Sequence, residues 1–279
     1  SGSGILPCGK CLSCQQAEKE LHGDIHLIKK DRDKKNISIE QVREFIKTLS
    51  MSSFLNSYKI GIVKHAEHLS QEAANALLKT LEEPKTKVII ILIAVDIAAL
   101  APTIVSRSQI LKFNLVKYDI IYDYLVKNYQ AKRSAAKDFA RLCLGRPALA
   151  VKFLENKEFR ESYLSRVQTL LQFYGQDINK RIAAVGELIN KKNGGQESVM
   201  IAGRILEIWQ GLIRDLLLLE FNQDNLIQHL LFADELNKIK AKFAVRDLLN
   251  LEKNLRDAKK YLAANVNPKL VLENAAVNI

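Results

Sequence analysis

The sequence predicts an α/β domain with a parallel sheet flanked by helices, followed by a small helical domain and a larger all-helical domain. Three observations lead to this fold class. Short apolar strand patterns alternate with helical patterns up to about residue 114, strand patterns are missing from residue 115 onward, and the remainder is a series of helical segments. The 279 residues, 48% of them hydrophobic, suffice for about two domains with a core each.

The first strand is predicted over Ile25–Ile28, and the charged run 29–35 after it is predicted as a solvated turn. Ser38 and Gln41 form a capping-box pattern, and apolar residues recur at helical spacing from there to Leu49. These patterns predict a strand followed by an amphipathic helix.

The next strand is predicted over Tyr58–Val63, and Ser70 is the predicted N-cap of a helix that ends before Pro84. The segment Val88–Val95 is apolar at every position, which predicts a strand covered on both faces, as in a parallel sheet between helices.

Helical patterns fill the rest of the chain, with breaks at Gly145-Arg146-Pro147 and Gly194-Gly195. A long helix is predicted over 244–264, and Asn267-Pro268 begins the last one, with asparagine as the cap. The single tryptophan, Trp209, is predicted to lie in a core or at a subunit contact.

Charge and hydropathy limit the class of protein. The chain carries 42 Lys and Arg against 31 Asp and Glu, a net charge of +11, which is compatible with a polyanionic partner such as nucleic acid. Its longest apolar stretch has eight residues, whereas a bilayer span needs about 20. We therefore expect no membrane association and a cytoplasmic location; residues 1–4, Ser-Gly-Ser-Gly, look like a cloning scar.

Three of the four cysteines, Cys8, Cys11 and Cys14, are each separated by two residues, the spacing at which thiolates converge on one metal ion. A tetrahedral zinc site would need a fourth ligand, from water, from His22 or His26, or from a neighbouring molecule. The alternative is three free thiols. The fourth cysteine, Cys143, is predicted to be a small core residue.

Five stretches carry a family resemblance: CGKCLSC at 8–14, AANALLKTLEEP at 73–84, PTIVSRS at 102–108, LGRP at 144–147 and NPKLVLE at 267–273. Together they resemble the clamp-loader subunits of bacterial DNA polymerase III, which are AAA+ proteins of the delta prime, gamma and tau type. The resemblance implies an AAA+ domain truncated at its N-terminus over 5–114, a helical lid at 115–157 and a helical collar at 158–279.

The resemblance also bears on ATP hydrolysis. Hydrolysing members carry two acidic residues where this chain has Lys64 and His65, and Ala94-Val95 stand where a polar sensor residue is expected. A lysine cannot bind Mg²⁺. The glycine-rich phosphate loop, which the family carries ahead of the cysteines, does not occur in these 279 residues. The pattern matches the delta prime type and predicts no ATPase activity of its own, with ATP bound by neighbouring subunits only.

In the same family, the arginine of the Ser-Arg-Cys motif reaches the ATP of the adjacent subunit. The resemblance assigns this arginine-finger role to Arg107, after Ser106, although Ser108 replaces the cysteine. The alternative is a surface arginine paired with a carboxylate. Arg146 falls at the family's second sensor segment, where it would contact a nucleotide or lie on the lid surface.

The family's zinc motif has the spacing C-x8-C-x2-C-x2-C, so the resemblance implies a structural Zn²⁺ on Cys8, Cys11 and Cys14, with the first cysteine ahead of Ser1. The implied partners are the gamma, tau and delta subunits, the sliding clamp and primed DNA. Two other functions remain open: a hydrolysing gamma or tau subunit, and a zinc-containing nucleic-acid-binding module.

Overall fold

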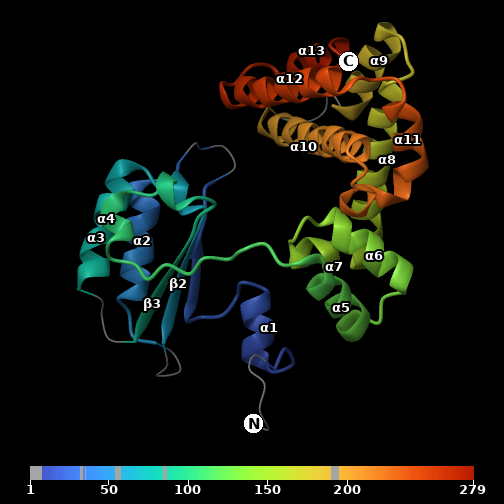
Figure 1. Cartoon of the computed structure of the whole chain (residues 1–279). Coiled ribbons are helices and arrows are strands. Elements are labelled where there is room, and N and C mark those ends of the chain that lie inside the picture. Colours follow the sequence, from blue (N-terminus) through green and yellow to red (C-terminus); the bar gives the residue numbers. More distant parts are fainter. Residues whose placement is uncertain (1–7, 32–33, 35, 54–57, 84–86, 190–194) are drawn as a thin grey trace. The chain divides into compact units, whose positions relative to one another are not determined.

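The computed structural model describes residues 8–31, 34, 36–53, 58–83, 87–189 and 195–279. The chain divides into two compact units, Ser1–Lys112 and Phe113–Ile279. Figure 1 shows the strands in the first unit and helices throughout the second. The suggested cloning scar at 1–4, the helix stop at Pro84 and the break at Gly194 lie outside the described residues.

The sheet of the first unit has three parallel strands in the order β1 (Ile25–Ile28), β2 (Lys59–Lys64) and β3 (Val88–Ile93). Ile25 pairs with Ile60, and Lys59 pairs with Val88. The parallel α/β arrangement predicted from the sequence is therefore confirmed.

Two helices, α2 (Ile39–Leu49) and α3 (Gln71–Glu82), bury their apolar stripes with the sheet in one core. Both predicted N-caps are present: the Ser38 hydroxyl accepts from the Gln41 amide, and the Ser70 hydroxyl accepts from Ala73. Gly61 permits the close approach of α2 to β2, because a Cβ there would lie 2.5 Å from a ring carbon of Phe45.

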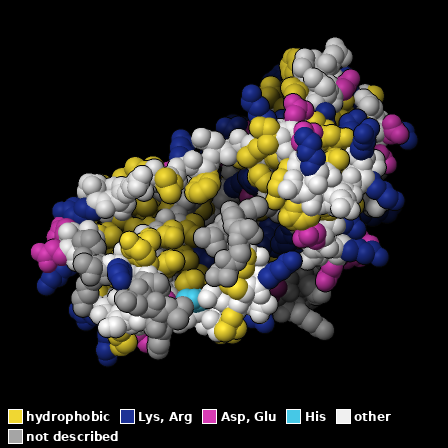
Figure 2. Space-filling model, turned by 90° about the horizontal axis from the view of Figure 1, so that it is seen from below, with side chains coloured by type: hydrophobic (Ala, Val, Ile, Leu, Met, Phe, Trp, Pro, Cys, Tyr) yellow, Lys and Arg dark blue, Asp and Glu magenta, His cyan; other side chains and the backbone are white. Residues whose placement is uncertain are grey.

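One prediction about the sheet is wrong. Val88, Ile90 and Leu92 pack against the core, but Ile89, Ile91 and Ile93 on the opposite face are 43–48% exposed. An unbroken apolar run places apolar side chains on both faces of a strand, yet α2 and α3 cover only one of them. Figure 2 shows hydrophobic side chains gathered on one face of this unit.

The remaining elements of the first unit are short: α1 (Leu12–Glu18), η1 (Ala66–His68), η2 (Ile97–Ala99) and α4 (Pro102–Val105). No residue of α1 is buried.

The described residues of the second unit form helices and no strand: α5 (Tyr118–Tyr129), α6 (Arg133–Leu142), α7 (Pro147–Glu155), α8 (Lys157–Phe173), α9 (Ile178–Leu188), α10 (Gly195–Glu220), η3 (Asp224–Leu226), η4 (Leu230–Phe232), α11 (Ala233–Lys240), α12 (Val245–Ala263) and α13 (Pro268–Val277). None of the helices in the described part of the chain has the length and apolar content that a membrane crossing needs.

Two groups of buried side chains hold this unit together. The smaller comes from α5, α6 and α7 and includes Cys143, and the larger spans α8 to α13 around Trp209, so both residues are core residues as predicted. Tyr163 of α8 packs against both groups. The division into a lid and a collar at residues 157 and 158 remains a prediction.

Candidate functional site

The three N-terminal cysteines come together at the start of α1. Their sulfur atoms all lie within 4.8 Å of one another, and the Cys8 and Cys14 sulfurs are 3.8 Å apart. Gly9, with φ +69°, makes the turn between them, and the Cys11 amide donates to the Cys8 sulfur over 3.4 Å. This arrangement could hold a metal ion.

The pKa values of Cys8 and Cys14 are shifted in opposite directions. Backbone amides of Lys10 and Cys11, and the neighbouring thiols, lower the pKa of Cys8 to about 7. The pKa of Cys14 is raised, chiefly because its thiol shares a hydrogen bond with Cys11. Thiolates are the form that binds metals, so Cys8 is the cysteine best prepared to bind one near neutral pH.

Neither histidine considered as a fourth ligand joins this cluster in the described part of the chain. The His22 Nδ1 atom accepts a hydrogen bond from the Asp24 amide at 3.1 Å. The ring of His26 is partly buried, and burial, together with the charge of Lys59, lowers its pKa. Of the alternatives, water or another molecule remains for the fourth position.

Arg107 follows α4 and is fixed by several contacts. Its Nε donates to a carboxylate oxygen of Glu82 at 2.8 Å, and one of its terminal nitrogens donates to the Thr103 carbonyl at 3.1 Å and to the Ser106 hydroxyl at 3.2 Å. The Arg107 side chain is still 36% exposed. Sequence reasoning missed the partner Glu82, although it lies in the leucine-rich motif at 73–84.

The end of β2 carries a cation and an imidazole. Lys64 forms an ion pair with Glu20 at 3.0 Å, and His65, in a left-handed conformation with φ 56°, lies 3.2 Å from Glu67. Burial raises the pKa of Glu67, but hydrogen bonds from its own amide and from His65 outweigh burial and leave that pKa lowered. The two positions expected to be acidic in hydrolysing relatives therefore hold groups with other partners.

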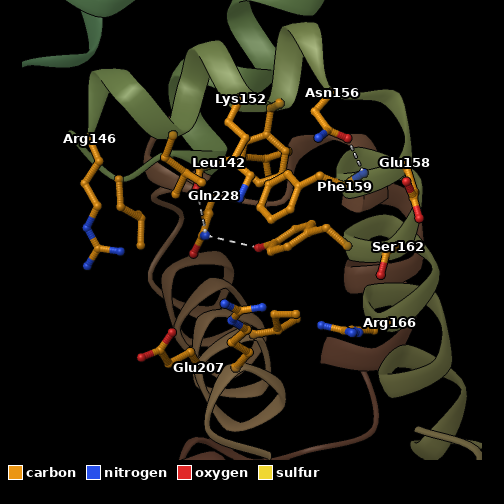
Figure 3. A pocket seen from close by; sticks show the side chains of 16 residues that line it. Leu142, Arg146, Lys152, Asn156, Glu158, Phe159, Ser162, Arg166, Glu207 and Gln228 are labelled. Carbon is orange, nitrogen blue, oxygen red and sulfur yellow. Dashed lines mark hydrogen bonds between the residues drawn. The ribbon is translucent and has the colours of Figure 1, made fainter. Parts of the chain in front are cut away.

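Arg146 lies at the start of α7 and lines a pocket of about 520 Å³ in the second unit. Figure 3 shows it at one side of the pocket, with Arg166 of α8 on another side. Arg166 and Arg204 of α10 also line the pocket, and sequence reasoning missed both. They lie far apart in the sequence, and no local pattern marks them as a pair.

A buried polar network lies beside this pocket. The Asp215 carboxylate accepts from the Gln228 amide, the His229 amide and the His229 ring, each at 2.8 Å. The other ring nitrogen of His229 lies 2.9 Å from the hydroxyl of Tyr163. Sequence reasoning did not single out these residues, although Asp215 is the only acid between Gly211 and Leu219 and could have been noticed there.

The fold defines the class: an α/β domain with a three-stranded parallel sheet, followed by a region whose described residues form only helices. The structure is similar to the crystal structure of a DNA polymerase III gamma subunit-related protein from Thermotoga maritima, with a TM-score of 0.56 over 91% of this chain and 82% of that one. At 20% identity, this likeness shows the fold alone.

The sequence is similar to subunits of DNA polymerase III. Residues 2–117 match the family described as DNA polymerase III, delta subunit. The DNA polymerase III subunit delta' of Haemophilus influenzae is 33% identical over 163 residues, 58% of this chain and 50% of that protein. The subunit delta' of Bacillus subtilis is 32% identical over 164 residues, 57% of this chain and 47% of that protein.

These matches confirm the predicted resemblance to DNA polymerase III clamp-loader subunits of the delta prime type. A gamma subunit from Buchnera aphidicola is also similar, 33% identical over 125 residues, 44% of this chain and 33% of that protein. The chain spans about half the length of the delta' relatives it matches.

Proposed function

We propose that the chain acts as a non-hydrolysing, delta prime-like subunit that assists ATP-dependent loading of a sliding clamp onto primed DNA. Its partners would be the gamma or tau and delta subunits, and the clamp and DNA through the assembled complex. In this proposal Arg107 is an arginine finger for the ATP of the adjacent subunit. The observation that carries it is the position of Arg107, anchored at the end of α4 yet 36% exposed.

The contacts of Arg107 suit a group that exchanges one anion for another. Its ion pair with Glu82 is exposed, and exposed pairs are worth about 0–1 kcal/mol, so little is lost when the carboxylate is exchanged. A guanidinium binds carboxylates and phosphates with the same planar geometry. The bonds to the Thr103 carbonyl and the Ser106 hydroxyl would hold it in place meanwhile.

The proposed lack of hydrolysis rests on Lys64 and His65. Mg²⁺ is bound by oxygen ligands, usually carboxylates, and Lys64 instead places a positive charge at the end of β2, paired with Glu20. The second candidate function, a hydrolysing gamma-type subunit, is supported by the similarity to the Buchnera aphidicola gamma subunit. ATP hydrolysis by the purified protein alone would support that alternative and contradict ours.

We assign a structural Zn²⁺ to Cys8, Cys11 and Cys14, because clustered thiolates are the ligands zinc prefers. When bound, the ion would stabilise the chain around α1, which has no buried residue to stabilise it.

The finger is tested by ATP turnover of a loader reconstituted with Arg107→Ala. Arginine fingers contribute roughly 10³–10⁵ in rate, so we expect a fall of that order, with Arg107→Lys only partly active. Glu82→Gln is the matched control, because it removes the same ion pair but keeps the guanidinium. Circular dichroism of each variant verifies its fold. Equal turnover in wild type and Arg107→Ala, or equal losses in Arg107→Ala and Glu82→Gln, would contradict the finger role.

A further inference from the structure

The pocket in the second unit has the size of a ligand site. Its volume is about 520 Å³, and small-molecule sites range over roughly 300–1,000 Å³. Residues of α7, α8 and α10 line it, together with Gln228 from the loop that precedes η4. Its walls include the apolar side chains of Leu149, Phe159 and Ile208.

The charges in the pocket are unbalanced. Four cationic side chains line it, from Arg146, Lys152, Arg166 and Arg204, against two acidic ones, Glu158 and Glu207. Within the described residues, none of the four cations forms an ion pair with a carboxylate. The contacts they do make are weak ones: Lys152 lies 4.2 Å above the ring of Phe159, and Arg204 approaches the sulfur of Met200 at 3.6 Å.

Arg166 and Arg204 belong to two packed helices, α8 and α10. Arg166 is half-buried, and burial, followed by the positive charge of Arg204, lowers its pKa. Two like charges held near each other without an anion destabilise the folded state. Figure 3 shows the Arg166 side chain pointing toward the middle of the pocket, where an anion would relieve this repulsion.

The polar floor of the pocket is fixed. Gln228 is only 7% exposed, and its amide donates to the Leu142 carbonyl at 3.2 Å and to the Tyr163 hydroxyl at 3.4 Å, as Figure 3 shows. Tyr163 is bonded in turn to His229, which Asp215 holds. A cavity with rigid polar groups is prepared for a ligand before the ligand binds.

We propose that this pocket binds a small phosphate ester of nucleotide size, with a phosphate group between Arg166 and Arg204 and the remainder against the apolar wall. Arginine is the side chain best matched to phosphate, because its planar donors bind two oxygens at once. Arg146 and Lys152, which are exposed as Arg204 is, would attract the ligand to the opening. The proposal does not depend on the role of Arg107.

The test is isothermal titration calorimetry of the full chain with inorganic pyrophosphate and, separately, with ADP. A hydrogen bond to a charged group is worth about 1.5–3 kcal/mol, so Arg166→Gln and Arg204→Gln should each weaken binding by about tenfold or more. Glu207→Gln removes a repelling charge from the pocket and should strengthen binding. Arg246→Gln, at an exposed position of α12, is the matched control and should leave binding unchanged.

Thermal unfolding separates lost binding from lost folding. Without a ligand, Arg166→Gln should melt at or above the wild-type temperature, because it removes one of two repelling charges. Added pyrophosphate should raise the melting temperature of the wild type more than that of Arg166→Gln. The proposal is overturned if pyrophosphate does not bind at millimolar concentration, or if the arginine variants bind as the wild type does. It is also overturned if only an oligonucleotide binds, which would make the pocket a nucleic-acid contact.

Discussion

Alanine substitutions at two glycines of α10 should change stability in opposite directions. A Cβ at Gly211 would lie 2.8 Å from the Gln228 Oε1 atom and 3.0 Å from the His229 Cε1 atom. A Cβ at Gly203 would meet no atom within 4 Å in the described part of the chain. Both positions are inside the same helix, so helix propensity acts equally on both.

The magnitudes follow from these contacts. Replacing a glycine by alanine inside a helix contributes about 1 kcal/mol, so Gly203→Ala should raise the free energy of unfolding by about that amount. At Gly211 the methyl group overpacks the loop, at a cost of about 1–3 kcal/mol. The His229 ring cannot move away freely, because it is bonded on both nitrogens, and loosening those bonds would cost about 1 kcal/mol more. The net effect at Gly211 should be a loss of about 1–3 kcal/mol.

Urea unfolding followed by tryptophan fluorescence measures both variants. Trp209 is the only tryptophan and is buried in the core of the second unit, so its emission reports on that unit. We expect the midpoint to rise for Gly203→Ala and to fall for Gly211→Ala, with unchanged slopes. If both variants are stabilised alike, the loop at 228–229 does not pack against α10, and our description of the pocket floor fails.

Two further expectations concern the buried carboxylate and the cysteines. Asp215→Ala should lower the free energy of unfolding by about 3–5 kcal/mol in the same fluorescence assay, since three buried donors lose their acceptor. Asp123→Ala removes only an exposed ion pair and should lower it by less than about 1 kcal/mol. Similar losses in the two variants would contradict the buried network around Asp215. In metal-free protein, alkylation of Cys8 should reach half its maximal rate near pH 7, because the thiolate forms as pH rises through the lowered pKa, and Cys14 should need higher pH. Zn²⁺ should protect both thiols, and labelling that zinc does not slow would count against the metal site.

Features set by neighbouring residues could be predicted from the sequence. The capping box of Ser38 and Gln41 and the cap at Asn267 depend on residues within one helical turn, and the structure contains both. The cysteine cluster is equally local, because a single turn brings Cys8 and Cys14 together. Each of these signals is complete within a few residues of chain.

Features that depend on where helices meet could not be predicted in the same way. Glu82 and Arg107 are 25 residues apart, and the Tyr163–His229 contact joins residues 66 apart. Their pairing depends on the packing of α3 with α4 and on the path of the loop before η4, which periodicity does not report. The exposed face of β3 was mispredicted for the same reason: the apolar pattern gives the character of a face, and only packing decides whether that face is covered.

The two arginine sites differ in a way that stability measurements can separate. Arg107 has a carboxylate partner at an exposed position, so removing it should change the free energy of unfolding by less than about 1 kcal/mol, whatever its effect on ATP turnover. Arg166 is half-buried beside another cation with no carboxylate paired to it in the described residues, so its removal should leave the ligand-free protein as stable or more stable. A bound anion would offset the repulsion between the two arginines and so stabilise the folded protein. Arg166 therefore indicates a bound ligand more strongly than Arg107 does. Of the two, only Arg166 destabilises the folded protein until an anion binds.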